Sequence, residues 1–363
     1  MRIDIQTMID NCNENGTVVL PEGEYESGPI VLKSRMTLEI PKGCTIHFST
    51  KFEDYLPVKF TRWEGVECYN YAPFIYARDC EDITICGGGV LDGQGQAWWH
   101  WKKLQGAAAQ ELMDSESKKI PVEQRVYGTE EAALRPSFVQ FIRCEKIKLL
   151  DFTIKDGPQW TIHPVYCRNV YAKGLKIITN GPNTDGFNPD SCRDVLIEKC
   201  EFSTGDDCIA INSGLNEDAW RVGIPCEQVE VRNCIFRKGH AAVAIGSGMS
   251  GGVEHIYVHD CAAVNTERGI RIKSMRGRGG YVRNVLVENF DMEEIVREAV
   301  QISMHYGSST AVPASDEPPV FSDIKISGVR CQRAGAGIEL RGLPESPMER
   351  ISLEKIELGK VLC

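Results

Sequence analysis

A short segment of alternating apolar and polar residues recurs along almost the whole chain. From Ile147 onward, successive copies begin 23, 25, 34, 27, 29, 39 and 27 residues apart. The copies lie at residues 36–40, 83–85, 147–149, 170–172, 195–197, 229–231, 256–258, 285–287, 324–326 and 351–353. This spacing is typical of one supersecondary unit stacked many times, with longer steps where a loop carries an insertion.

The copies are β-branched runs bounded by Gly, Asn and Asp, and almost no helical periodicity separates them. A propeller blade needs about 40 residues, which is longer than these steps. A unit of about 25 residues without a helix instead predicts an all-β parallel β-helix, in which each coil supplies about three short strands. No Pro-, Gly- or Ser-rich linker divides the chain, so we expect one domain over residues 1–363.

Two kinds of segment depart from the repeat. Residues 4–13 have helical spacing of apolar side chains and are followed by Asn-Gly, which predicts a short N-terminal helix that caps the open end of the stack. Residues 106–134, with an Ala run and mixed charges, and the Pro-containing residues 308–320 read as inserted loops. Long loops of this kind often shape the binding face of a solenoid.

The composition excludes several classes of protein. A net charge of −10 argues against a nucleic-acid partner, and no apolar run is long enough to cross a membrane. The chain has 15 Cys, many in strand-like segments, such as Cys144, Cys167, Cys192 and Cys234. Because a secreted protein usually pairs its thiols and no apolar leader follows Met1, we expect reduced core cysteines in a cytoplasmic protein. Without CxxC or HExxH motifs, no metal or cofactor is expected.

Three carboxylates are the main candidates for chemistry. Asp185 lies in Asn-Thr-Asp-Gly, and Asp206 and Asp207 lie 21 and 22 residues later in Gly-Asp-Asp-Cys. Alone, each motif is more often a turn. One coil apart in a solenoid, however, the three side chains meet on one face, where they repel and one keeps its proton near neutral pH. An acid beside a base is what the cleavage of a glycosidic bond requires.

Basic side chains follow at the same repeat. A lone His is more often a surface or core residue, but His240 lies a further coil along and is predicted to hold an aspartic acid in position. Arg271 and Lys273 alternate on one strand and therefore project from one face. Exposed cations near three carboxylates are expected to bind a substrate carboxylate.

Other residues are candidates for substrate binding. Asn183 belongs to the first acidic motif, and Tyr306 follows the cationic strand. His163 precedes the acidic coil by about one repeat and is expected to reach an adjacent sugar subsite. The aromatic residues concentrated within 63–101 are as consistent with core packing as with sugar stacking.

Taken together, Asn-Thr-Asp, Gly-Asp-Asp, Gly-His and Arg-Ile-Lys, in this order and spacing, resemble the polygalacturonase family of glycoside hydrolases, family 28. The resemblance covers nearly the whole chain. Residues 61–71 and 160–164 are similar to its bacterial branch, which includes exo-acting enzymes. The resemblance implies a right-handed parallel β-helix that forms a catalytic domain, and hydrolysis of α-linked galacturonic acid with inversion.

The resemblance also implies a role for each site residue. Asp206 is expected to be the general acid, while Asp185 and Asp207 hold and activate the water. His240 is expected to assist the acid. Arg271 and Lys273 are expected to bind the galacturonate carboxylate, and the partner is a galacturonate-containing oligosaccharide or polysaccharide, attacked from the chain end.

Two departures leave alternatives open. Ala241 follows His240 where the family usually has Gly, and Asn212 stands where many bacterial members carry Lys. The loss of that cation leaves the uronide substrate undecided, so a rhamnogalacturonan galacturonohydrolase or related rhamnogalacturonan hydrolase is the main alternative. A pectate lyase, which needs calcium and a basic catalytic residue, and a non-catalytic carbohydrate-binding β-helix are more distant ones.

Overall fold

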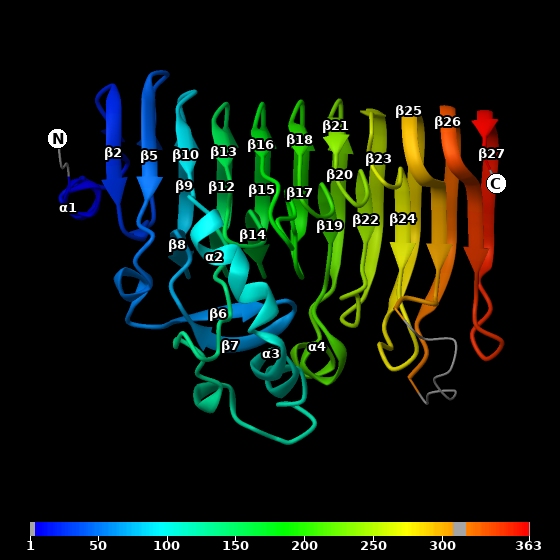
Figure 1. The fold of residues 1–363 in the computed structure, drawn as a ribbon, viewed down its shortest axis with the longest axis horizontal. Coiled ribbons are helices and arrows are strands. Elements are labelled where there is room, and N and C mark those ends of the chain that lie inside the picture. Colours follow the sequence, from blue (N-terminus) through cyan, green and yellow to red (C-terminus); the bar gives the residue numbers. More distant parts are fainter. Residues whose placement is uncertain (1–3, 308–316, 363) are drawn as a thin grey trace.

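The computed structural model describes residues 4–307 and 317–362 as a long stack of coils. Neighbouring coils pair through parallel strands that form three ladders along the stack (Figure 1). We call these the first, second and third ladders, in the order in which the chain meets them in each coil. The predicted parallel β-helix is therefore present.

The first ladder begins with seven short strands. These are β1 (Gly16–Val19), β4 (Met36–Glu39), β9 (Glu81–Cys86), β12 (Glu145–Leu150), β15 (Arg168–Lys173), β17 (Arg193–Glu198) and β20 (Cys226–Arg232). Longer strands then run on through the corners into the next ladders. These are β23 (Val253–Ala263), β25 (Tyr281–Ser303), β26 (Val320–Arg341) and β27 (Glu349–Val361).

The recurrent sequence segment corresponds to the first ladder. Met36 pairs with Ile83, which pairs with Ile147, and the same column continues to Ile351. Its inward side chains are almost fully buried as far as the coil of β26. The stacking of like residues in this column builds the continuous core.

The second and third ladders complete each coil. The second ladder contains β2 (Gly23–Ser27), β5 (Cys44–Phe48), β10 (Val90–Asp92), β13 (Thr153–Lys155), β16 (Lys176–Ile178), β18 (Glu201–Ser203) and β21 (Ile235–Lys238). The third contains β3 (Ile30–Val31), β8 (Ile75–Arg78), β11 (Val139–Ile142), β14 (Ile162–Val165), β19 (Ile209–Ile211), β22 (Val243–Ile245) and β24 (Ile270–Lys273). Between β14 and β19, Phe187 and Asp190 continue the third ladder through isolated bridges.

The N-terminal helix closes one end of the stack. Helix α1 (Ile5–Asp10) is shorter than the predicted 4–13, with Asp4 as its N-cap. The side-chain amide of Gln6 donates to the carbonyl of Val31 at 3.1 Å and accepts from its N–H at 2.8 Å. This amide takes the place of a neighbouring strand at the edge of β3, so the helix caps backbone groups that would otherwise be open to pairing.

The four cysteines named in the sequence analysis lie at corners of the coils rather than within the strands. Cys144, Cys167 and Cys192 each precede a strand of the first ladder, and Cys234 precedes β21 of the second. Their thiols are buried and bond to nearby carbonyl groups, as Cys167 does to Val165 at 3.3 Å. All cysteines of the described residues are free. A small, weakly polar side chain suits an inward corner position.

An insertion and a hairpin project from one side of the stack, below the coils of its N-terminal half in Figure 1. The hairpin pairs β6 (Lys59–Trp63) with β7 (Val66–Asn70) in antiparallel fashion, and η1 (Phe52–Tyr55) precedes it. The insertion runs over residues 93–138, from β10 to β11. It holds α2 (Gln96–Trp99), η2 (His100–Lys103), α3 (Gly106–Met113) and η3 (Val122–Gln124). We call the hairpin and this insertion the wall.

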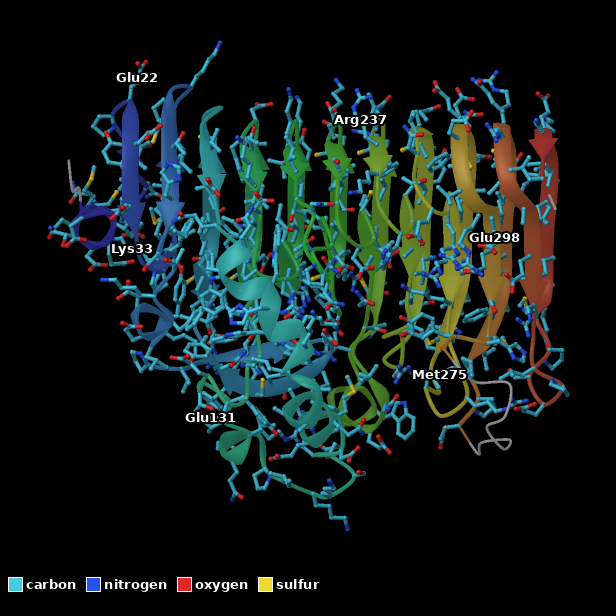
Figure 2. All side chains as sticks on the ribbon, in the orientation of Figure 1. Glu22, Lys33, Glu131, Arg237, Met275 and Glu298 are labelled. Atoms are coloured by element: carbon cyan, nitrogen blue, oxygen red, sulfur yellow. The ribbon has the colours of Figure 1, made fainter. Side chains whose placement is uncertain are left out.

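The insertion is longer than the predicted 106–134. Buried polar contacts anchor the wall to the stack. Arg62 reaches from the hairpin to Asp190 in the stack at 2.8 Å, with both side chains fully buried. Arg125 of the insertion pairs with Asp218 of α4 (Asn216–Val222) at 2.7 Å. Figure 2 shows side chains filling the region between the insertion and the stack, with Glu131 on the insertion's outer side. These buried pairs fix the wall against the coils that carry the acidic motifs.

Of the predicted loop at 308–320, residues 308–316 lie outside the described part of the chain. Within the described residues, no helix is both long and apolar enough to span a membrane.

Candidate active site

The third ladder brings the three predicted carboxylates together. Asp185 and Asp207 each precede by two residues one partner of the bridge between Phe187 and Ile209. The N–H of Gly186 donates to the carbonyl of Asp207 at 3.0 Å, which fixes this register. Carboxylate oxygens of Asp185, Asp206 and Asp207 all lie within 4.8 Å of one another. Stacking at one-coil spacing has therefore assembled the cluster.

His240 lies one coil beyond Asp206. Its backbone N–H donates to the carbonyl of Asp206 at 2.9 Å, and its Nδ1 is 2.9 Å from Asp206 Oδ1. The hydrogen bond with Asp206 raises the pKa of His240, although partial burial acts in the opposite direction. The imidazole therefore retains a proton to higher pH than a free His, and the His240–Asp206 pair holds one proton.

The carboxylates differ in how readily they ionise. Burial, followed by the charges of Asp206 and Asp207, raises the pKa of Asp185 well above its ordinary value. Burial also acts to raise the pKa of Asp206, but the hydrogen bond from His240 and the charges of His240 and Lys273 outweigh it, so this pKa is lowered. Asp185 therefore keeps its proton to higher pH than a free carboxyl group, whereas Asp206 shares the proton of His240.

Lys273 is buried, contrary to the expectation from the sequence. It was expected to be exposed beside Arg271, but it is only 7% exposed, and its Nζ lies 2.6 Å from Asp207 Oδ2. A buried carboxylate among others needs a counter-charge, and Lys273 supplies it. The second oxygen of Asp207, Oδ1, is buried and makes no hydrogen bond within the described residues. That oxygen can accept a hydrogen bond from a water or a substrate hydroxyl.

Arg271 and Tyr306 lie on the C-terminal side of the carboxylates. Arg271 Nε donates to Gln301 Oε1 at 2.8 Å, and its guanidinium carbon is 5.6 Å from the centre of the Tyr306 ring. Lys273 Nζ lies 5.3 Å from the same ring. Arg271 is partly exposed, and among the described residues its other guanidinium N–H groups make no hydrogen bond, so they are available to a further partner. These residues form a cationic, aromatic border at this side of the site.

Asn183 is positioned by the wall. Its backbone has a φ of 56°, in the left-handed region that Asn tolerates better than most residues. Arg135, at the end of the insertion, donates to Asn183 Oδ1 at 2.9 Å and to the carbonyl of Pro182 at 2.7 Å. The wall therefore fixes the loop that carries Asp185.

His163 was expected to reach a sugar subsite, and its geometry is not compatible with that role. The side chain is 0% exposed, with Nδ1 2.9 Å from Gln140 Nε2 and Nε2 3.3 Å from Asp190 Oδ2. Burial lowers the pKa of His163, although Asp190 acts against this effect. His163 is part of a buried network in which Asp190 also contacts Arg62. This network supports the coils that carry the site.

The carboxylates open into a pocket of about 310 Å³. Its lining includes Asp185, Asp206, Asp207, Asn183, Asn212, Lys273 and Tyr306 from the stack. Glu64, Lys102 and Met113 of the wall line it as well, together with Trp160. The wall therefore lies at the N-terminal side of the pocket. Of the aromatic residues within 63–101, Trp63, Trp98 and Trp101 are buried and therefore pack in the interior rather than line the pocket.

Comparison with known proteins agrees with this geometry. The sequence family described as glycosyl hydrolases family 28 matches residues 12–360.

The chain belongs to glycosyl hydrolase family 28.

Its structure is similar to that of a hyperthermoactive exopolygalacturonase from Thermotoga maritima. The two are 35% identical with a TM-score of 0.90, over 96% of this chain and 80% of the other. The family 28 exopolygalacturonase of Yersinia enterocolitica shares the fold, with 22% identity and a TM-score of 0.81 over 99% of this chain and 72% of the other.

A probable polygalacturonase from Vitis vinifera is 29% identical over 348 residues, or 93% of this chain. The chain spans 66% of the length of that relative. The predicted family and the right-handed parallel β-helix are thus confirmed.

Sequence reasoning missed the pocket residues that the wall supplies. Glu64 and Gly65 form a turn between two apolar segments, which is a hairpin signal. Reading that signal would have predicted the hairpin, although not that its tip enters the pocket. No pattern in the sequence indicated Lys102, because its place depends on how the whole insertion folds back.

Proposed function

We propose that this family 28 chain is an exo-acting hydrolase that removes galacturonic acid from the ends of α-linked, pectin-derived oligosaccharides. The observation that carries the proposal is the position of the wall, which lines the N-terminal side of the pocket next to three clustered carboxylates. A pocket bounded in this way favours a chain end over the middle of a polymer. The similarity to two exopolygalacturonases supports the same mode of attack.

In the proposed reaction, the bond between the anomeric carbon and the leaving oxygen breaks. The shared proton of the His240–Asp206 pair passes from Asp206 to that oxygen, and the pair regains a proton from solvent after the products leave. A water oxygen bonds to the anomeric carbon, and its proton goes to Asp185 or Asp207. Asp207 Oδ1 is available to orient this water, since its other oxygen is paired with Lys273.

The proposed stereochemistry is inversion by a single displacement. The carboxylate oxygens are closer, within 4.8 Å, than the groups of most inverting glycosidases, which lie about 6.5–9.5 Å apart to admit a water. Inversion here requires the water to be bound beside the carboxylates rather than between widely spaced ones. Proton NMR of the first product decides the matter: a β-anomer from the α-linked substrate means inversion, and an α-anomer means retention.

Charges around the pocket support a uronide substrate. Arg271 and Tyr306 border the C-terminal side, and the exposed Lys102 lies on the wall. Lys102 can therefore attract a substrate carboxylate into the pocket. Asn212, in the pocket lining, is neutral and favours the main alternative, in which a neutral sugar such as rhamnose follows the terminal galacturonate.

The proposal is tested by product identification on saturated trigalacturonate and on rhamnogalacturonan oligosaccharides with terminal galacturonate. Release of galacturonic acid from the first supports the proposed substrate, and release only from the second supports the alternative. An ultraviolet-absorbing product that forms only with calcium would instead reveal a lyase. No release from either would refute a galacturonate hydrolase.

A further inference from the structure

The tip of the wall's hairpin is a tight turn formed by Glu64 and Gly65. Glu64 and Gly65 have φ values of 42° and 91°, so both central residues of this tight turn are in or near the left-handed region. Turns of this kind favour Asn, Asp or Gly at such positions. A Glu is less favourable at this position than Asn, Asp or Gly.

Gly65 explains why the turn fits so closely. A Cβ on this residue would lie 3.1 Å from the backbone nitrogen of Leu215 and 3.2 Å from Gly214. The hairpin tip is therefore pressed against the loop that precedes α4. This contact fixes the place of Glu64 in the pocket lining.

The Glu64 side chain is held from one side only. Its Oε1 accepts a hydrogen bond from Nε2 of the buried Gln159 at 3.0 Å, and no bond to Oε2 forms within the described residues. Burial raises the pKa of Glu64, although the charges of Lys102 and Arg135 act in the opposite direction. Glu64 and Lys102 both line the pocket.

The proton donor sets the direction of the sugar chain. His240 lies on the C-terminal side of Asp206, the same side as Arg271 and Tyr306. The leaving group, which receives the proton, belongs on that side. The sugar that keeps the anomeric carbon then lies toward the wall, with its non-reducing end facing Glu64.

A terminal galacturonate in a chain linked through O4 presents a free 4-hydroxyl next to its 5-carboxylate. The wall offers a hydrogen-bond acceptor, Glu64, beside a cation, Lys102. A carboxylate in the pocket repels an anionic substrate, and a hydrogen bond from a substrate hydroxyl group would offset that repulsion. The two side chains therefore match the two adjacent substituents of the sugar. Glu64 can accept a hydrogen bond from the 4-hydroxyl, and Lys102 can bind the carboxylate.

We propose that Glu64 is a specificity-determining residue that accepts a hydrogen bond from the free 4-hydroxyl of the terminal galacturonate. The enzyme then selects saturated chain ends, which hydrolases produce, over the 4,5-unsaturated ends that lyases leave, because the latter lack this hydroxyl. The inference rests on the proposed exo-acting function.

The test compares kcat/KM for saturated and 4,5-unsaturated trigalacturonate in the wild type and in Glu64→Asn. Asn tolerates the left-handed backbone, so the variant folds, but its side chain is too short to replace the carboxylate. We expect the wild type to prefer the saturated trimer by at least about 100-fold, as sites built to bind a hydroxyl do. The variant should lose about 10-fold or more on the saturated trimer and nothing on the unsaturated one.

Glu123→Asn is the matched control, because Glu123 is an exposed Glu of the same insertion outside the pocket lining. It should leave both rates unchanged. An equal loss on both trimers in Glu64→Asn would show a purely structural role and overturn the inference, as would a wild type without preference. Failure of the wild type to cleave the saturated trimer would instead refute the proposed function itself.

Discussion

Lys273→Met should destabilise the protein strongly, because it removes the counter-charge of a buried carboxylate. Lys273 and Asp207 are 7% and 1% exposed, and their Nζ and Oδ2 atoms are 2.6 Å apart. Loss of one partner of a buried pair costs about 3–5 kcal/mol. Here Asp207 would also face Asp185 and Asp206 without compensation. The loss is large against a total unfolding free energy of about 5–15 kcal/mol.

The measurement is urea unfolding followed by circular dichroism. Arg271→Met is the matched control: it removes a cation from the same strand that is only half-buried and bonds to Gln301. It should cost about 1 kcal/mol, the value of one hydrogen bond. Adding Asp207→Asn to Lys273→Met should recover part of the lost stability, since the uncompensated charge disappears.

Equal costs for Lys273→Met and Arg271→Met would refute this reasoning. They would mean that Lys273 is a solvent-facing cation available to substrate, as the alternation along its strand had suggested.

Three further outcomes follow from the site. Asp206→Asn should lower kcat by about 10²–10⁴-fold without loss of folding, and a variant with more than about a tenth of the wild-type rate would sink the assignment of the acid. The profile of kcat/KM against pH should be bell-shaped, because activity falls below the raised pKa of Asp185, whose base form is needed, and above the raised pKa of His240, whose proton is needed. His240→Asn should alter the alkaline limb, and an unchanged limb would show that another group sets it. Thiol titration should find few reactive groups in the native protein and close to 15 after denaturation; a denatured count near one would indicate disulfides and a secreted protein.

Much of the fold could be predicted because one period governs it. The recurrent apolar segment corresponds to a single column of the first ladder, in which Ile147, Val170 and Val195 pair in register. The same period placed Asp185, Asp206 and Asp207 together, since a residue and its counterpart one coil later are neighbours by construction. Periodicity is thus enough to predict both the core and the centre of the site.

Burial within the site could not be predicted in the same way. Alternation along β24 indicates that Arg271 and Lys273 share a face, but it does not say which one bends over to reach a carboxylate two coils away. His163 lies on the same ladder as the site, yet Gln140 and Asp190 enclose it. Such differences depend on side-chain contacts between coils rather than on spacing.

The wall was hardest to foresee because it does not repeat. Its position depends on buried pairs between distant segments, such as Arg62 with Asp190 and Arg125 with Asp218. Sequence indicated that an insertion was present but not that Glu64 and Lys102 would enter the pocket. The positions of such residues follow from tertiary packing alone.

The mode of attack is tested most directly by following the viscosity of polygalacturonate against the release of reducing ends. Because the wall bounds the pocket beside the carboxylates, we expect galacturonic acid monomer as the main early product while viscosity stays high. A rapid fall in viscosity with mixed oligomers at low conversion would contradict the account, because it would require an open cleft that accepts the middle of a chain.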